Sequence, residues 1–154
     1  MAMHTWFECK IRYEKTMENG MNKKVTEPYL VDALSFTEAE ARIIEEVTPF
    51  ITGEFTVSDI KRANYSELFV SDEEAADRWF KCRLFFITLD EKSGAEKKTA
   101  SFVLVQAADL RDAVRKLDEG MKGTMADYQI ASVAETAIMD VYPYSAEPDD
   151  KPEV

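Results

Sequence analysis

The stretch WFECKI at residues 6–11 returns as WFKCRL at residues 79–84, so one strand-like hexapeptide occurs twice, 73 residues apart. Two further stretches recur with an offset of 74, Lys23-Lys24 as Lys97-Lys98 and Tyr29-Leu30-Val31 as Val103-Leu104-Val105. One extra residue in the second hairpin accounts for the change of offset. The chain therefore predicts an internal duplication, in which one set of elements is used twice.

Each copy begins with apolar side chains at alternate positions, which is typical of a half-buried strand. These positions are Phe7, Cys9, Ile11 and Tyr13 in the first copy, and Phe80, Cys82, Leu84 and Phe86 in the second. Asn19-Gly20 and Ser93-Gly94 predict hairpin loops, followed by second strands at about 25–33 and 99–107. Pro28 has no N–H to donate, so it predicts that the first of these second strands is an edge or is irregular there.

A helix is predicted after each hairpin. Ser35 and Glu38 have the spacing of a capping box, and Asp109 and Asp112 stand at the equivalent positions. Pro49 and Gly53 end the first helix. Apolar residues recur at helical spacing behind both caps: Phe36, Ala39, Ile43 and Val47 in the first helix, and Leu110, Ala113, Val114, Leu117 and Met121 in the second.

The last element of each copy is predicted to be extended, over about 55–69 and 128–142. In both segments the alternation of apolar side chains changes parity at the same place, which indicates a β-bulge or bend. Each copy is therefore β-β-α-β. The predicted fold class is α+β, with duplicated units related by pseudo-twofold symmetry and antiparallel sheet whose helices pack on one face of each copy.

The predicted domain organisation is one compact domain over residues 1–144. It consists of two repeats, about 5–70 and 78–144, joined by a short linker at 71–77 that opens with a helical turn. If the sheets join edge to edge, the fold has two layers. If their outer faces meet, it has four layers and both tryptophans are buried. Residues 145–154 are predicted to be a disordered acidic tail.

Composition narrows the class of protein. The 154 residues carry a net charge of −11, which opposes nonspecific binding to nucleic acid or to anionic membrane. No apolar run has the length of a membrane span, and the first residues lack the pattern of a signal peptide. We expect a cytoplasmic protein with no membrane association. The predicted sheet edges leave room for a homodimer.

Catalytic and metal-binding motifs are missing from the sequence. Cys9 and Cys82 occupy the same position of the two copies, and we interpret them as small core side chains. Together with the one histidine they are too few to hold zinc, so no metal and no cofactor is predicted. No nucleophile, phosphate-loop or dinucleotide motif occurs. A catalytic residue is therefore not assigned, and an enzyme acting through scattered carboxylates is the weakest of three hypotheses.

The best candidate site lies on the strand face opposite the predicted core. It combines aromatic and basic residues: Trp6, Lys10, Arg12, Trp79, Lys81 and Arg83. The leading hypothesis is a non-catalytic binding or regulatory domain that takes a small anionic ligand or a protein partner there. Aromatic and cationic groups on an open sheet also suit single-stranded nucleic acid, which is the second hypothesis. Alternatively, both tryptophans are structural and the basic side chains cover the sheet.

The ordered pattern of motifs, from WFEC at residues 6–9 through SVAET at 132–136 to IMDVYPY at 138–144, resembles an uncharacterised protein family of Bacteroidetes, a domain of unknown function with a repeated WF-x-C strand motif. The likeness covers nearly all of the chain except its tail. It implies a bacterial cytoplasmic protein, and it brings no activity, cofactor or catalytic residue with it.

Overall fold

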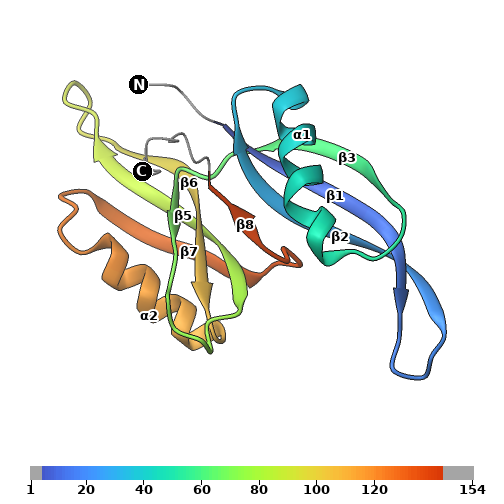
Figure 1. The fold of residues 1–154 in the computed structure, drawn as a ribbon. Helices are drawn as coiled ribbons and strands as arrows, with labels where there is room; N and C mark the ends of the chain where they lie inside the picture. The colour runs from blue at the N-terminus through green and yellow to red at the C-terminus, as the bar shows by residue number, and fades with distance from the viewer. Residues whose placement is uncertain (1–4, 144–154) are drawn as a thin grey trace, which may run out of the picture. The chain divides into compact units, whose positions relative to one another are not determined.

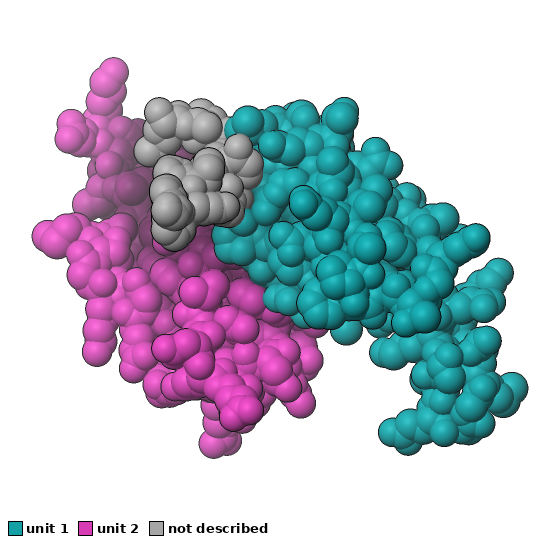
Figure 2. All heavy atoms as spheres, viewed as in Figure 1, with its two compact units in different colours: residues 1–63, 138–154 teal, residues 64–137 magenta. Residues whose placement is uncertain are grey.

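The computed structural model describes residues 5–143, which form two four-stranded sheets and two α-helices, an α+β fold. The chain divides into two compact units. Unit 1 comprises residues 1–63 and 138–154, and unit 2 comprises residues 64–137 (Figure 2). The predicted acidic tail and Tyr144, the last residue of the predicted domain, lie outside the described residues. That the two units form one domain stays a prediction.

Unit 1 is built on a long hairpin of β1 (Thr5–Thr16) and β2 (Asn22–Ala33). The helix α1 (Phe36–Val47) follows, with a 3₁₀ turn at Thr48–Phe50. The strand β3 (Phe55–Ala63) returns antiparallel to β1, but only as far as Tyr13, so the rest of the hairpin projects beyond the three-stranded part (Figure 1). The fourth strand, β8 (Val141–Tyr142), pairs parallel with β2, which gives the order β3-β1-β2-β8.

Unit 2 has the same kinds of element. The hairpin consists of β5 (Arg78–Leu89) and β6 (Glu96–Ala107), followed by α2 (Leu110–Met121) and β7 (Asp127–Glu135), which pairs antiparallel with β5. The strand β4 (Glu67–Phe69) lies parallel to β6, so the order is β4-β6-β5-β7.

Two sequence-based predictions are wrong in detail. The long extended segments at 55–69 and 128–142 each break in two, and the second pieces, β4 and β8, join the sheets in parallel, so neither sheet is purely antiparallel. The break in the first segment, between β3 and β4, coincides with Ser66. The N–H and the hydroxyl of Ser66 both donate to the Phe102 carbonyl. The helical turn predicted at 71–77 is also wrong. One hydrogen-bonded turn forms there in place of a helix, with the Ala76 N–H donating to the Glu73 carbonyl.

The predicted β-bulges are confirmed in both units. The register of β1 and β3 shifts between Lys10 and Ile11, which leaves Ser58 as the extra residue. The register of β5 and β7 shifts between Arg83 and Leu84, which leaves Ala131 as the extra residue. The parity change in the sequence is therefore the direct signature of an inserted residue, since side chains beyond it change faces.

Both predicted helix caps are confirmed. The Ser35 hydroxyl accepts from the N–H of Glu38, and the Asp109 carboxylate accepts from the N–H of Asp112. The carboxylates of Glu38 and Asp112 in turn accept from the N–H groups of residues 34 and 108, just before each cap. These reciprocal bonds satisfy donors that the first helical turn leaves without partners.

Each helix covers one face of its own sheet. The two cores consist of buried strand and helix residues: Phe7, Cys9, Ile11, Val31, Ala39, Ile43 and Val47 in unit 1, and Phe80, Cys82, Leu84, Val103, Val105, Ala113 and Leu117 in unit 2. Cys9 and Cys82 are free and fully buried. Burial raises the thiol pKa of Cys9 to about 12 and that of Cys82 to about 11, so both thiols stay protonated at neutral pH.

Candidate functional site

The structure places the six predicted site residues on the strand faces away from the helices, but it does not expose them equally. Trp6 and Lys10 are half-buried and Arg12 is exposed. In unit 2, Trp79 is only 4% exposed, whereas Lys81 and Arg83 are exposed. A buried ring offers no free face for stacking. The accessible part of the unit 2 surface therefore begins at Lys81.

The outer face of unit 1 carries charges of both signs. Lys10 lies opposite Asp59 of β3, and its neighbour on the same face, Glu8, lies opposite Lys61. Trp6 lies opposite Asp32 of β2. Because residues opposite each other in a sheet share a face, Lys10 and Lys61 each have a carboxylate beside them. Arg12 differs, since it lies opposite Thr26 and Thr56. This face has little net attraction for an anion.

The outer face of unit 2 is different. Lys81 lies opposite Leu104 and Ala134, and Arg83 lies opposite Phe102 and Ser132, so uncharged side chains flank both cations. The Lys81 ammonium lies 4.6 Å from the centre of the Phe102 ring and 6.0 Å from that of Tyr65. The Arg83 guanidinium lies 4.9 Å from the ring of Phe85.

We refer to Lys81, Arg83, Phe85, Phe102 and Tyr65 as the cation–aromatic surface. The rings are half-buried, so each cation rests against a partly exposed aromatic face. No carboxylate lies opposite these cations in the sheet, so they can attract an anion from solvent. Sequence analysis named the two cations but missed the rings. The alternation of β5 and the pairing of Arg83 with residue 102 were the signals that could have found them.

A wide hollow of about 960 Å³ lies at the projecting end of the unit 1 hairpin. It includes Arg12, and its other charged residues are Glu14, Lys24 and Glu54. Two cations and two carboxylates leave no net charge, and the hollow gathers no catalytic set. Within residues 5–143, no group of three or more metal-ligating side chains comes together.

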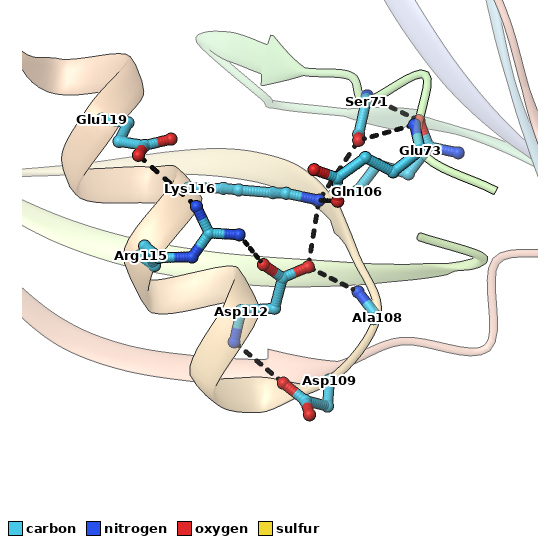
Figure 3. Close-up of polar contacts among 9 residues, drawn as sticks. All are labelled: Ser71, Glu73, Gln106, Ala108, Asp109, Asp112, Arg115, Lys116 and Glu119. Carbon is cyan, nitrogen blue, oxygen red and sulfur yellow. Dashed lines mark hydrogen bonds and ion pairs between the residues drawn. The ribbon is translucent and has the colours of Figure 1, made fainter. Parts of the chain in front are cut away.

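A second polar cluster, which the sequence analysis missed, lies on α2 (Figure 3). The Lys116 ammonium contacts the Glu73 carboxylate at 2.7 Å, the Asp112 carboxylate at 3.0 Å and the Ser71 hydroxyl at 3.2 Å. Asp112 also accepts from Arg115 and from the N–H of Ala108. Only the contacts within α2 were visible in the sequence, as the i,i+3 spacing of Asp112 with Arg115 and its i,i+4 spacing with Lys116.

This α2 network holds in place the chain that follows β4. The Ser71 N–H donates to the Gln106 side chain at 2.9 Å, while its hydroxyl receives Lys116. In unit 1, Arg42 of α1 likewise holds the chain that follows β8, because its guanidinium donates to the Pro143 carbonyl at 3.0 Å. With its donors taken up by three acceptors, Lys116 anchors structure and is not available for chemistry.

The Asp112 carboxylate should make stability depend on acid pH. Hydrogen bonds from the Ala108 N–H, Lys116 and Arg115 lower its pKa from 3.8 to about 2. A lowered pKa stabilises the fold fully above about pH 4, and this contribution is lost as the pH falls through about 2. We expect the stability gap between the wild type and Asp112→Asn to shrink between about pH 5 and pH 2, as measured by urea unfolding. Asp109→Asn, which keeps a capping oxygen, is the control; a gap independent of pH would contradict the assignment.

The chain belongs to an α+β family whose activity is not defined. The family model, described as "Domain of unknown function (DUF4494)", matches residues 5–144. No curated protein matches the chain. Among the described residues, no helix is long and apolar enough to cross a membrane. The family assignment confirms the resemblance to a domain of unknown function, whereas a Bacteroidetes origin stays a prediction.

Proposed function

We propose that this protein is a non-catalytic binding domain that takes an anionic ligand on the cation–aromatic surface of unit 2. The observation that supports the proposal most directly is the setting of Lys81 and Arg83. Both are exposed, both rest against aromatic rings, and the residues opposite them in the sheet are uncharged. The cations would attract the charge of the ligand, and the rings would contact its planar or apolar part.

The contrast with unit 1 supports placing the binding site on unit 2 alone. At the positions that match Lys81 and Phe85 in the sequence repeat, unit 1 carries Glu8 and Arg12. These differences, together with Ser132 and Ala134 at the positions of Asp59 and Lys61, separate a mixed-charge face from one that combines cations with rings. The net charge of −11 does not oppose local binding, because electrostatic attraction is screened over about 10 Å at 0.1 M salt.

A titration of the full, ¹⁵N-labelled chain with adenosine monophosphate tests the proposal. This probe combines a phosphate with a planar ring. We expect its amide shift changes to centre on residues 81–85 and 100–102, and Lys81→Ala with Arg83→Ala to weaken binding by roughly tenfold, about 1.4 kcal/mol. The matched control, Lys10→Ala with Arg12→Ala, removes the same number of charges from unit 1 and should change little. Equal losses in both double variants, or no shift changes, would refute the proposal.

Single-stranded nucleic acid is the second candidate, because its phosphates and bases need the same two kinds of group. A thymidine dodecamer distinguishes it from a small ligand. Binding of a polyanion releases counterions and falls steeply with salt, with a slope that grows with the number of phosphates contacted. Binding of the dodecamer that is no tighter than that of the mononucleotide would exclude the second candidate. The enzyme hypothesis has no observation in its favour.

We further propose that the two units arose by duplication and are related by pseudo-twofold symmetry within a single domain. The recurring hexapeptide, the matching caps and the bulges at Ser58 and Ala131 support common ancestry. A cytoplasmic location fits the free, buried cysteines and stays a proposal.

A further inference from the structure

The strand β7 forms one edge of the unit 2 sheet. It pairs with β5 on one side, and within residues 5–143 no strand pairs with it on the other. Seven of its nine residues are exposed. Along an edge strand every second residue directs its N–H and C=O away from the sheet, so β7 presents unpaired backbone donors and acceptors to solvent.

This edge lacks the protection that its counterpart in unit 1 has. The middle of β3 carries three charged residues, Asp59, Lys61 and Arg62, which oppose the approach of another strand. In β7, residues 128–134 contain no charged residue and no proline. Both strands carry a bulge, so the bulge is not what separates them. Charge is the difference, and it leaves β7 open to strand addition.

The charges at the ends of β7 indicate what kind of strand fits. Asp127 has no ion pair within the described residues. At the other end, Glu135 lies 3.8 Å from Arg78, which offsets its charge. Within the described residues, the carboxylate of β7 that lacks an ion pair therefore lies at the Asp127 end. A basic residue on an added strand would be stabilised there.

Two other occupants fit less well. A second copy paired antiparallel over the whole of β7 would set Asp127 against Glu135 at both ends, and like charges opposite each other are destabilising. The chain's own residues 145–154 contain two prolines and four carboxylates against one lysine. Neither brings net positive charge to the Asp127 end, and proline cannot donate to a ladder.

We propose that β7 is a docking edge for an extended segment of a partner protein. This segment is uncharged along its middle and carries lysine or arginine at the end that lies beside Asp127. Main-chain hydrogen bonds to the β7 edge hold it, and the basic residue sets its register and direction.

The probe is a synthetic blocked heptapeptide, Val-Thr-Val-Thr-Val-Lys-Lys, titrated into the full ¹⁵N-labelled chain. We expect shift changes and slowed amide exchange along β7. The same peptide with alternate N-methylated residues cannot complete the ladder and should not bind. A version with Glu-Glu in place of Lys-Lys should bind several-fold more weakly. Asp127→Asn should reduce the preference for lysine, whereas Asp59→Asn on β3 should leave it unchanged.

Outcomes of three kinds would overturn the proposal. The first is the absence of any change at β7 with millimolar peptide. The second is binding at β3 in place of β7, or equal binding of the acidic and basic peptides. The third is concentration-dependent association of the protein through β7 before peptide is added, which would make a second copy the occupant. Far-UV circular dichroism of each variant confirms that it folds.

Discussion

Phe80→Ala is expected to lower the free energy of unfolding by about 3–5 kcal/mol, the range for deleting a buried aromatic side chain. Phe80 is 2% exposed and lies in the core between α2 and its sheet. Truncation removes the buried ring and leaves a cavity that the surrounding strands can fill only in part. The free energy of unfolding of a small protein is only about 5–15 kcal/mol, so this loss is a large share of the stability.

Urea unfolding followed by circular dichroism measures this effect. The matched control is Phe85→Ala, which removes the same ring from the outer face of β5, where it is half-buried. We expect Phe85→Ala to lower the free energy of unfolding clearly less than Phe80→Ala does. Equal losses would mean that burial against α2 is not what makes Phe80 important.

The same measurement on Phe7→Ala tests the predicted single domain. Phe7 is 1% exposed in the core of unit 1. If the units unfold as one cooperative domain, as we propose, either substitution moves one common transition. Two transitions, each shifted by only one of the substitutions, would show independent domains.

Gly120→Ala is expected to destabilise the protein by about 1–3 kcal/mol, as overpacking does. A Cβ built at residue 120 would lie 2.8 Å from the ring tip of Phe69. The Phe69 ring, which comes from β4, therefore occupies the space that a side chain at residue 120 would need. Within a helix, alanine is more stable than glycine by up to about 1 kcal/mol. The clash with Phe69 therefore has to cost more than this gain for the substitution to destabilise the protein. Thermal and urea unfolding provide the measurement.

The double variant with Phe69→Ala isolates the cause. Without the ring, Gly120→Ala should become stabilising by up to about 1 kcal/mol, because only the helix preference remains. A change of sign between the two backgrounds is the expected result. If alanine stabilises the protein in both backgrounds, the ring moves aside freely and the contact does not constrain β4.

Local signals in the sequence predicted the local structure well. Ser35 with Glu38 and Asp109 with Asp112 place both caps, because a cap depends only on residues three apart. The bulges were found because one inserted residue changes the parity of every side chain after it. The hairpin turns followed from Gly20 and Gly94, which have positive φ angles of 85° and 73°.

Long-range pairing was beyond those signals. The strands β4 and β8 have three and two residues, too few for periodicity to show, and nothing in such short runs says which sheet they join. The burial of residues on the outer faces of the sheets could not be predicted from the sequence either. Alternation separates two faces of a strand but does not say what covers each, so Trp79 was expected on the site and is buried. Glu73 and Lys116 are 43 residues apart, so their contact left no trace in the sequence.

The placement of β8 bears on the order in which the protein folds during synthesis. Unit 2 is a continuous run, residues 64–137, so all four of its strands have been synthesised once β7 is made. Unit 1 begins at the N-terminus, yet its sheet needs residues 141 and 142 from the far end of the chain. The half of the protein that is synthesised first is therefore the half that is completed last.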